Sequence, residues 1–587
     1  MDYQMKASDY IVQFLVDQGI DKAFGYIGGA VAHLYDSLDK NKAIEIINTI
    51  HEQGAGFAAE GYARVTGKTG VATATSGPGA TNLITPIGSC FFDSIPTLFI
   101  TGQVNTYEYK YDTPVRQIGF QETDIVSIVK PITKYAVMID TIQSLRYELE
   151  KAYFLTQNGR KGPVLIDIPM NIQRTNFNPS EQKSFFESDE YKMMRIHDDN
   201  VDFKKIVEML KISHHPIVLI GGGSRLSSLA PEAINHLLKK SNLPVVYSLM
   251  GKDVIKDGYK YNFGLIGSYG NRYSNLALAN ADLIIVLGSR LDTRQTGTDL
   301  KTFAREAKII QVDIDANELG SKIKADVALH YDIADFINEL LHYDFRLNFD
   351  KWLEKLIGYK QKYSSTTGID GKAKIPNQII KCIAQSSSDN DIICVDVGQH
   401  QMWVAQSFDT KADQRVLFSG GMGAMGFALP TAIGATIATG KRALVIAGDG
   451  GFQMNIQELE VIKRRNLPIK IFIMNNANLG MVRQFQEIYF EKRYIGTQKD
   501  YSVPNFASIA SAYGLKSSTV STMEEISHKI QETLLSDEAE VINICLQEQM
   551  TTVEPKLIVN KPIEDMYPFL DRKELNAQMI ITPLDKE

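Results

Sequence analysis

Short hydrophobic runs recur along this chain, and most of them end in glycine, aspartate, asparagine or proline. Their residues do not alternate with polar ones, which is typical of strands covered on both faces in a parallel sheet. The runs are PVLIDIP (163–169), PIVLIGGG (216–223), LPVVYSL (243–249), DLIIVLGS (282–289), AKIIQVDID (307–315), DIICVDVG (391–398), ALVIAGDG (443–450) and IKIFIMNN (469–476). Segments with helical spacing, such as PEAINHLLKKSN (231–242), lie between most of them. The repeated strand–helix pattern predicts an α/β protein of stacked, doubly wound parallel-sheet domains.

Two polar segments interrupt this pattern. Residues 178–200 are densely charged, and residues 363–376 are rich in serine, threonine and glycine. We interpret both as connectors, which divides the chain into three domains and a tail. The predicted boundaries are 1–180, 200–345, 375–545 and a C-terminal tail at 546–587.

Composition and charge exclude several classes of protein. Hydrophobic residues make up 44% of the chain and charged residues 22%, with a net charge of −7, so no basic surface for nucleic acid is expected. No hydrophobic run approaches the ~18 residues that a membrane span requires. Cys90, Cys382, Cys394 and Cys545 lie far apart with no CxxC pair, which favours free thiols in a reducing compartment. Together with the absence of an apolar signal core at the N-terminus, this predicts a cytoplasmic protein.

The most informative pair of motifs is GDGG (448–451) and NN (475–476). Each motif ends a hydrophobic run, and the gap between them suits a helical crossover, so both strands should be parallel and finish at one sheet edge. Either motif alone is an ordinary turn. Together, the Asp449 carboxylate and the Asn476 amide oxygen, beside glycines that open a helix, predict a Mg²⁺ site with a cradle for a diphosphate.

A second informative stretch is NTIHEQGAGFAAEGYAR (48–64), in which Glu52 precedes a helix built from small and aromatic residues. One interpretation is structural: Thr49 and Glu52 fit the capping box of a helix N-terminus. The other is that Glu52 serves a ligand. The stretch by itself does not decide between them.

Taken together, these motifs resemble the thiamine diphosphate-dependent enzymes, and among them the acetolactate synthase large-subunit group. The resemblance runs in collinear order from about residue 5 to 545. Its further segments are FGYIGGA (24–30), ATSGPGATNL (74–83), ITGQV (100–104), FQETDIV (120–126), GPVLIDIP (162–169), SLMGK (248–252), GSRLDTRQTG (288–297), VDIDANELG (312–320), DVGQHQMW (396–403) and SGGMGAMGFALPTAIGA (419–435). It implies one domain for the cofactor's pyrimidine, a central FAD-binding-like domain and one for its diphosphate. It also implies a homodimer or homotetramer, in which Glu52 of one subunit faces the Asp449 site of another, and a possible regulatory subunit.

The resemblance assigns roles to residues of the thiamine diphosphate site. Glu52 would hydrogen-bond the pyrimidine and promote the imino form that accepts a proton, with Gln121 and Gly29 as further catalytic residues. Mg²⁺ would be held by Asp449, Asn476 and the main-chain oxygen of Asn478. Further contacts to the cofactor would come from Gly398, Gln399, His400, Gly423, Met425, Gly450, Gly451 and Met481.

The central domain is predicted to hold FAD in a structural role. The residues that match the flavin-binding segments are Arg160, Gly222, Gly223, Arg290, Asp313 and Asp315. Aspartates that close a strand are also frequent helix caps, which is the alternative for Asp313 and Asp315.

The acceptor side of the predicted site departs from the family. Phe120, Lys134, Arg294 and Phe485 match substrate-binding positions, but Phe485 replaces the family's tryptophan. Departures of the same kind are Ser268 and Tyr269 in place of Met-His, Thr293 in place of an acid, Met170 in place of lysine, and the closing segment 554–575. The smaller Phe485 side chain leaves room for a larger acceptor.

The sequence therefore predicts a carboligase that decarboxylates pyruvate and transfers the two-carbon unit to a 2-keto acid. Transfer to a nucleotide-linked ketosugar is the alternative, and the closing segment favours it. Two further hypotheses are a cofactor-binding subunit without activity and a flavin oxidoreductase. The first is disfavoured by the presence of Glu52, Asp449 and Asn476.

Overall fold

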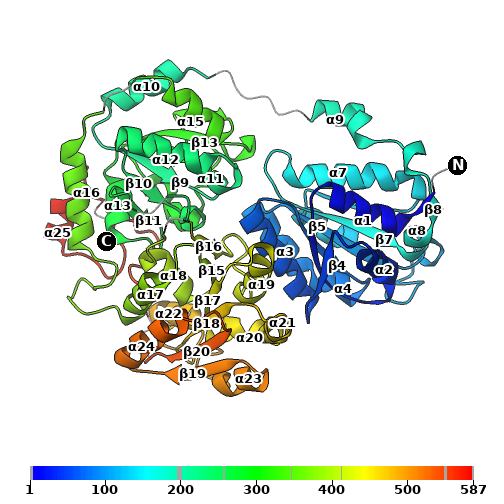
Figure 1. Cartoon of the computed structure of the whole chain (residues 1–587). Coiled ribbons are helices and arrows are strands. Elements are labelled where there is room, and N and C mark those ends of the chain that lie inside the picture. The colour runs from blue at the N-terminus through cyan, green and yellow to red at the C-terminus, as the bar shows by residue number, and fades with distance from the viewer. Residues whose placement is uncertain are drawn as a thin grey trace.

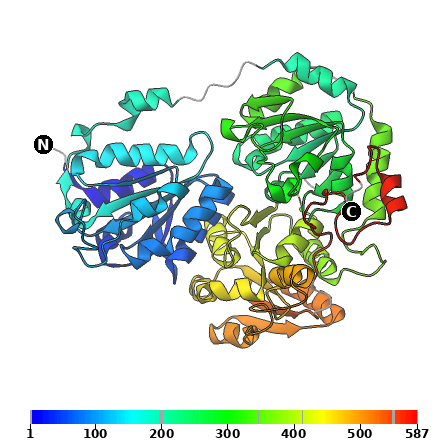
Figure 2. The ribbon, with the colours of Figure 1, turned by 180° about the vertical axis from the view of Figure 1, so that it is seen from behind.

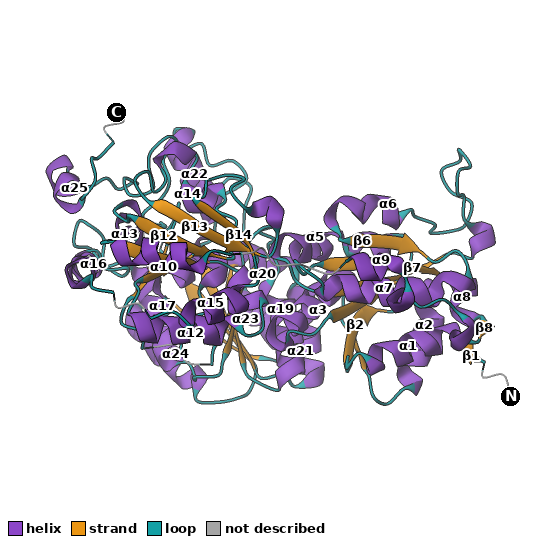
Figure 3. Ribbon diagram, turned by 90° about the horizontal axis from the view of Figure 1, so that it is seen from above, coloured by secondary structure: helices purple, strands orange, loops and turns teal. Residues whose placement is uncertain are grey.

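The chain folds into three lobes, each built on a six-stranded sheet (Figure 1). The structure is a computed structural model, and it describes residues 4–194, 201–255, 258–344, 347–411, 413–547 and 552–584. Every strand pair within the three sheets is parallel, and helices cover both faces of each sheet (Figure 3). The predicted α/β fold class is confirmed.

The N-terminal lobe contains the sheet with strand order β3-β2-β4-β5-β7-β6. Its strands are β2 (Lys22–Tyr26), β3 (Glu45–Asn48), β4 (Gly70–Ala74), β5 (Thr97–Gln103), β6 (Tyr135–Met138) and β7 (Pro163–Pro169). A small antiparallel pair, β1 (Met5–Lys6) and β8 (Asn176–Phe177), ties the beginning of the lobe to its end. Its helices are α1 (Ala7–Asp17), α2 (Ala32–Lys40), α3 (Glu52–Thr66), α4 (Pro78–Asn82), α5 (Ile84–Asp93), α6 (Ile125–Val129), α7 (Leu145–Gln157), α8 (Met170–Arg174) and α9 (Asp189–Met193).

The central lobe has strand order β11-β10-β9-β12-β13-β14, the order of dinucleotide-binding sheets. Its strands are β9 (Pro216–Ile220), β10 (Val245–Tyr247), β11 (Asn262–Leu265), β12 (Leu283–Leu287), β13 (Lys308–Asp313) and β14 (Val327–His330). Its helices are α10 (Phe203–Ile212), α11 (Gly223–Leu226), α12 (Ala230–Ser241), α13 (Arg272–Ala279), α14 (Thr293–Thr296), α15 (Ile333–Leu341) and α16 (Asp350–Lys362).

The third lobe repeats the topology of the first, with strand order β16-β15-β17-β18-β20-β19. Its strands are β15 (Ile392–Val395), β16 (Arg415–Phe418), β17 (Ala443–Gly448), β18 (Ile469–Asn475), β19 (Lys516–Val520) and β20 (Glu540–Cys545). Its helices are α17 (Ile375–Ser386), α18 (Gln399–Ser407), α19 (Ala428–Thr439), α20 (Asp449–Met454), α21 (Leu459–Arg465), α22 (Gly480–Tyr489), α23 (Phe506–Ala512) and α24 (Met523–Leu534). The C-terminal tail, described over 552–584, carries α25 (Arg572–Gln578) and returns to the central lobe (Figure 2).

The hydrophobic runs all contain strands, and their lack of alternation has the predicted cause. Every residue of β7 and of β18 is buried, because helices pack on both faces. The charged connector at 178–200 is less irregular than predicted, since its described part holds two single 3₁₀ turns, η5 (Pro179–Glu181) and η6 (Phe185–Glu187), and α9. All four cysteines are free thiols, and Cys90 and Cys394 are buried. Within the described ranges, no helix is long and apolar enough to cross a membrane.

Helices α3 and α19 join the first and third lobes at a close crossing (Figures 1 and 2). A Cβ added to Gly61 would collide with the carbonyl oxygen of Thr431, and one added to Gly434 would collide with that of Ala58. The glycines therefore allow the two helix backbones to touch. This fixes the start of α3, where Glu52 lies, against the third lobe.

A buried charge network joins all three lobes beside this crossing. Arg64 of α3 forms an ion pair with Asp93 at 2.7 Å, and Asp93 accepts the Gly420 and Gly421 amides of the third lobe. The backbone oxygen of Arg64 accepts a hydrogen bond from Arg415 Nη1 at 2.6 Å.

Arg415 continues this network into the central lobe. Its guanidinium pairs with Asp253 at 2.7 Å, and Asp253 also pairs with Arg225. Burial alone would raise the pKa of Asp253, but Arg225 and Arg415 outweigh it and lower the pKa to about 2.

We expect Asp253→Asn to destabilise the folded chain by about 3 kcal/mol, because it leaves two largely buried guanidiniums without the negative charge between them. The measurement is the urea midpoint at pH 7. Since the pKa of Asp253 is depressed, its contribution is full above the unfolded value of ~3.9 and declines as the pH falls toward 2.

The control is Asp36→Asn, which breaks an exposed pair with Lys40 and should change the midpoint little. A loss no larger than that of the control would contradict the proposed importance of the network.

Candidate active site

The predicted ligand-binding segments lie at the points where strand order reverses in each sheet. These points are between β2 and β4, between β9 and β12, and between β15 and β17. In open parallel sheets, ligands bind beyond the carboxyl ends of the strands at such a point. The residues there are Gly28 and Gly29 in the first lobe, Gly221–Gly223 in the central lobe, and the segments 396–400 and 448–451 in the third.

The capping-box interpretation of Glu52 is wrong. The N-cap of α3 is His51, whose Nδ1 accepts the Gln53 amide at 3.1 Å, while Thr49 donates its hydroxyl to the His51 carbonyl. Glu52 is 8% exposed, and its Oε2 accepts a hydrogen bond from Asn82 Nδ2 at 2.9 Å. Its carboxylate is thus available for chemistry other than closing its own helix.

The other two predicted catalytic residues lie around the same loop, residues 75–79. A Cβ on Gly79 would be 3.2 Å from Glu52 Oε1, and one on Gly77 would be 3.1 Å from the Cβ of Gln121. Gly29 follows β2 with open space at its Cα, and the next amide, of Ala30, donates to Thr75 Oγ1 at 3.2 Å. Gln121 holds a left-handed φ of 65°, which turns the chain sharply here.

The third lobe holds the start of α3 through hydrogen bonds. The Glu458 carboxylate accepts the amides of Ile50 and His51 at 3.1–3.2 Å, and Asn455 Nδ2 donates to Gln53 Oε1 at 3.1 Å. Burial raises the pKa of Glu458 to about 7 although it accepts these amides. Glu52 is therefore flanked on both sides by residues held from the third lobe of the same chain.

The predicted metal ligands meet at the carboxyl ends of β17 and β18, which pair in register up to Gly448 and Met474. Asp449 Oδ2 accepts the Asn476 amide at 3.1 Å, and Asp449 Oδ1 accepts the hydroxyl of Tyr501. Asn476 Oδ1 accepts the Asn478 amide at 3.2 Å.

This donor set fits Mg²⁺. Asp449 is 2% exposed, and its carboxylate accepts hydrogen bonds from the Asn476 amide and the Tyr501 hydroxyl. In the described part of the chain, Asn478 Oδ1 is buried without a hydrogen bond. A single carboxylate with amide and backbone oxygens suits a hard cation that also binds a phosphate.

Glycines and the buried His400 ring lie where the diphosphate cradle is predicted. His400 is 4% exposed, and its Nε2 has no hydrogen-bond partner in the described part of the chain. Burial lowers the pKa of His400 to about 3, so the ring is neutral at pH 7. A Cβ on Gly448 would be 3.0 Å from its Cε1, which places the ring over the glycine turn. The ring also forms a hydrogen bond with the backbone of Asp396. The buried Nε2 without a partner in the described ranges indicates that a ligand completes the site at the start of α18 and α20.

The methionine predicted to separate the cofactor rings is close to this cradle. A Cβ on Gly450 would lie 3.2 Å from Met425 Cε and 3.1 Å from the Tyr501 hydroxyl. Gly423 has a φ of 63° and is exposed, and Met481 is half-buried at the start of α22. The end of the Met425 side chain thus lies beside Gly450, where Leu479 also approaches.

The predicted flavin residues border one large cleft of about 1320 Å³ between the lobes. Arg160, Gly222, Gly223, Arg290 and Asp313 line it. Burial raises the pKa of Asp313 to about 6. Arg64, Asp93 and Arg415 of the interlobe network also line this cleft, as does Gly423.

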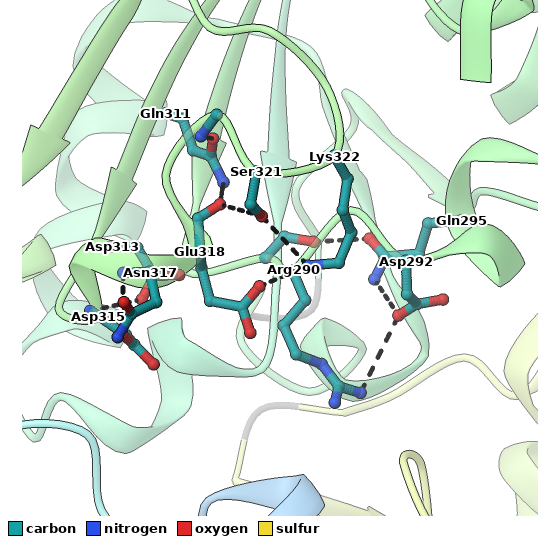
Figure 4. A network of polar contacts seen from close by, with 12 residues as sticks. Arg290, Asp292, Gln295, Gln311, Asp313, Asp315, Asn317, Glu318, Ser321 and Lys322 are labelled. Atoms are coloured by element: carbon teal, nitrogen blue, oxygen red, sulfur yellow. Dashed lines mark hydrogen bonds and ion pairs between the residues drawn. The ribbon is translucent and has the colours of Figure 1, made fainter.

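Asp315 differs from the other flavin candidates. It does not line the cleft but caps a 3₁₀ turn, η9 (Ala316–Glu318), by accepting the Asn317 amide at 3.0 Å, as Figure 4 shows. Its second oxygen pairs with Arg160 at 3.0 Å. The helix-cap alternative therefore describes Asp315, which acts on the cleft through Arg160.

The predicted substrate residues fall into two groups. Arg294 lies over the ring of Tyr269 at 5.9 Å, and both line the large cleft. Phe485, 49% exposed, packs its ring 4.6 Å from Tyr489.

Phe120 and Lys134 are elsewhere, in the N-terminal lobe. Phe120 is 86% exposed next to Gln121. Lys134 donates to the Asn158 carbonyl at 2.6 Å, and burial, with a smaller effect of Arg160, lowers its pKa to about 8.

Several site residues were not predicted from sequence. Tyr501 and Glu458 follow no motif, and only the fold brings them to Asp449 and to the start of α3. Asn82 was not predicted either, although it lies within the family-like segment ATSGPGATNL (74–83), after Gly77 and Gly79.

Comparisons with known proteins agree with this arrangement. Residues 5–128, 203–340 and 396–544 match the family models for the N-terminal, central and C-terminal domains of thiamine pyrophosphate enzymes. The N-terminal and C-terminal models are described as TPP-binding domains.

Similar proteins extend over most of the chain. An acetolactate synthase large subunit from Lactococcus lactis is 37% identical over 87% of each chain. The acetolactate synthase isozyme 2 large subunit of Escherichia coli is 33% identical over 98% of this chain and 99% of its own. A chloroplastic acetolactate synthase of Arabidopsis thaliana is 35% identical over 91% of this chain and 80% of its own.

The glycine turn at 448–451 permits a specific test. A Cβ at Gly451 would collide with Asp396 Oδ1, and Asp396 holds the Val397, Gly426 and Ala428 amides at 2.8–3.0 Å. We expect Gly451→Ala to displace the segment before α19, cost about 1–3 kcal/mol, and weaken binding of thiamine diphosphate at least about tenfold. Thermal denaturation and calorimetric titration measure the two effects.

The matched control is Gly358→Ala in α16, where an added Cβ meets nothing within 4 Å. It should leave binding unchanged and stabilise slightly. Equal behaviour of the two variants would refute the role given to the turn.

Proposed function

The chain belongs to the thiamine pyrophosphate enzymes, and from that premise we propose that it is an acetolactate synthase large subunit. It would decarboxylate pyruvate and transfer the two-carbon unit to a second 2-keto acid. The observation that carries this proposal is the placement of Asp449 and His400, whose Nε2 has no partner among the described residues, at the strand-order reversal of the third lobe, with Asn476 bonded to Asp449 from the end of the adjacent strand β18. Bound thiamine diphosphate would supply the electron sink for decarboxylation.

We propose Asp449, the Asn476 side chain and the Asn478 main-chain oxygen as ligands of Mg²⁺. The Asn476 backbone amide already donates to the Asp449 carboxylate at 3.1 Å, so the ligands would need little rearrangement. His400, Gln399 and the glycines at 398, 450 and 451 would receive the diphosphate. Met425, with Gly423 and Met481 nearby, would support the cofactor rings.

Glu52 is the proposed acid–base partner of the cofactor's pyrimidine. Its carboxylate is nearly buried and held by the Asn82 amide, which leaves Oε1 to share a proton with a ring nitrogen. Gln121 and Gly29 border the same loop and would orient the reacting groups. Burial excludes water, which strengthens the hydrogen bond that Glu52 makes.

A homodimer is part of the proposal. Apolar side chains around Gly29 and Gln121 are exposed in the single chain: Tyr107 is 70% exposed, Ile118 55% and Phe120 86%. Exposed apolar patches of this kind favour burial against a partner. A second copy would cover this surface and complete the substrate site, and a regulatory subunit would bind elsewhere. Assembly into a tetramer and a cytoplasmic location stay predictions.

FAD is the proposed occupant of the large cleft. Its volume exceeds that of sites for small ligands, and it lies at the strand-order reversal of a dinucleotide-type sheet. Arg160, Gly222, Gly223, Arg290 and Asp313 would contact the flavin directly. We assign FAD a structural role, because charged residues of the network that joins the three lobes also line this cleft.

A 2-keto acid is the proposed acceptor. Arg294 offers a guanidinium for its carboxylate, and Phe485 with Tyr489 offers an apolar wall. The relatives named as acetolactate synthases do not favour the ketosugar alternative. An inactive subunit is disfavoured because Glu52, Asp449 and Asn476 are all present and buried or half-buried.

We expect Glu52→Gln to lower pyruvate consumption by at least about 100-fold while thiamine diphosphate still binds, because the amide cannot share a proton with the pyrimidine. Assays of CO₂ release measure the rate, and calorimetry measures cofactor binding. Glu45→Gln, which alters a surface pair with Arg465, is the control and should retain full activity. Undiminished turnover in Glu52→Gln would favour the inactive-subunit or flavin hypotheses.

Product analysis tests the acceptor. Supplied with pyruvate, Mg²⁺ and thiamine diphosphate, the protein should form acetolactate, and a chelator should abolish the reaction by removing the cation that Asp449 and Asn476 would hold. Mass spectrometry identifies the product. CO₂ release that depends on an added ketosugar would refute the 2-keto acid acceptor, and bleaching of bound flavin in step with turnover would indicate an oxidoreductase.

A further inference from the structure

A row of side-chain amides connects the C-terminal tail to the candidate metal site. It runs from Val553 in the tail through Gln484 of α22 and Gln399 of α18 to Asn476, which follows β18. Val553 is fully buried, and Gln484 and Gln399 are 2% and 3% exposed. Water therefore competes little for these hydrogen bonds.

The hydrogen bonds in this row have ordinary lengths and link each side chain to the next. Gln484 binds both polar groups of Val553: its Oε1 accepts the Val553 amide at 2.9 Å, and its Nε2 donates to the Val553 carbonyl at 3.1 Å. Gln399 Nε2 donates to the same Gln484 Oε1 at 2.9 Å. Asn476 Nδ2 donates to Gln399 Oε1 at 3.1 Å.

The tail backbone determines the direction of the whole row. A backbone N–H can only donate and a carbonyl can only accept, so Val553 fixes which end of the Gln484 amide is oxygen. Gln399 must then present its NH₂ group to Gln484, which leaves its oxygen for the Asn476 NH₂ group. The Asn476 side-chain oxygen is consequently turned to the other side, toward the Asn478 amide.

We propose that Gln484 is a positioning residue through which the docked tail orients the Asn476 oxygen as a ligand of the metal. The inference rests on the proposed function, which gives Asn476 that role. A carboxamide that turned over would present NH₂ groups to a cation, which cannot ligate it. Gly480 makes the arrangement possible, because a Cβ there would lie 2.7 Å from Asn476 Nδ2.

The tail is anchored on both the third and the central lobe. Trp403 Nε1 donates to the Thr552 carbonyl at 3.1 Å, and Gln406 Nε2 donates to the Glu554 carbonyl at 3.1 Å. Farther along, Glu564 pairs with Arg305 at 2.7 Å, and Arg272 donates to the Pro568 carbonyl at 2.6 Å. Figures 1 and 2 show the tail running beside the central lobe. Docking of the tail on these lobes would thus determine how the Asn476 oxygen is oriented at the metal site.

Binding of the metal and docking of the tail are then coupled in both directions, because a coupling free energy between two sites is reciprocal. Adding Mg²⁺ and thiamine diphosphate to the full-length protein should slow amide hydrogen exchange in the segment that begins at Val553. Unchanged exchange there, in protein that binds the cofactor, would overturn the inference.

The decisive variant is Gln484→Met, which keeps the length of the side chain and removes its polarity. We expect the Mg²⁺ concentration that half-saturates thiamine diphosphate binding to rise about tenfold, the effect of losing a few buried hydrogen bonds. The cofactor-dependent slowing of exchange from Val553 onward should disappear.

The matched control is Gln486→Met on the same helix. Gln486 is also buried, but its amide bonds the Ile495 carbonyl at 2.9 Å and the Thr497 hydroxyl at 2.6 Å, away from the tail. It should leave both measurements as in the wild type.

Wild-type metal dependence in Gln484→Met, or an equal change in both variants, would overturn the positioning role. If Gln484→Met does not fold, the exchange measurement on the wild type still decides. Wild-type protein that binds no thiamine diphosphate would contradict the proposed function, and the inference would fall with its premise.

Discussion

The crossing of α3 and α19 is the contact on which the candidate site depends. Glu52 and Asp449 belong to lobes separated by hundreds of residues. In the proposed homodimer each would face its counterpart on the partner subunit, so the placement of the two lobes within one chain would decide the geometry of both sites. Because Gly61 and Gly434 carry no side chain, the two helices meet backbone to backbone and leave little freedom to slide. Glu458 and Asn455 of the third lobe also form hydrogen bonds with His51 and Gln53 at the start of α3.

The interlobe charges have a complementary effect. Arg64, Asp93, Arg415 and Asp253 are held in a largely buried chain, and buried charges are stable only when each has a partner in good geometry. The network therefore specifies one arrangement of the three lobes rather than adding much net stability. Residues of all three lobes line the large cleft beside the network. The shape of this cleft therefore depends on how the lobes are placed relative to one another.

Two buried polar atoms without hydrogen-bond partners among the described residues lie at the candidate site. His400 Nε2 and Asn478 Oδ1 are buried and unsatisfied in the described part of the chain, and such groups cost free energy unless something binds them. Both lie around Asp449, whereas Gln399, Gln484 and Asn476 in the same region are joined to one another by hydrogen bonds. The region thus combines a network of side-chain amides with two buried polar atoms that lack partners in the described part of the chain.

The sequence by itself determined the parallel sheets, the pairing of GDGG with Asn476, and the family, because these depend on local periodicity and on strand ends that must share a sheet edge. It did not determine the N-cap of α3. Thr49 and Glu52 fit the capping-box pattern, but His51 is the N-cap, and the Thr49 hydroxyl donates instead to the His51 carbonyl. It also gave no sign of Tyr501, Glu458 or the Val553–Gln484 bond. Those contacts join residues dozens to hundreds of positions apart, and only the packing of the lobes, through buried surfaces that no local pattern encodes, brought them together.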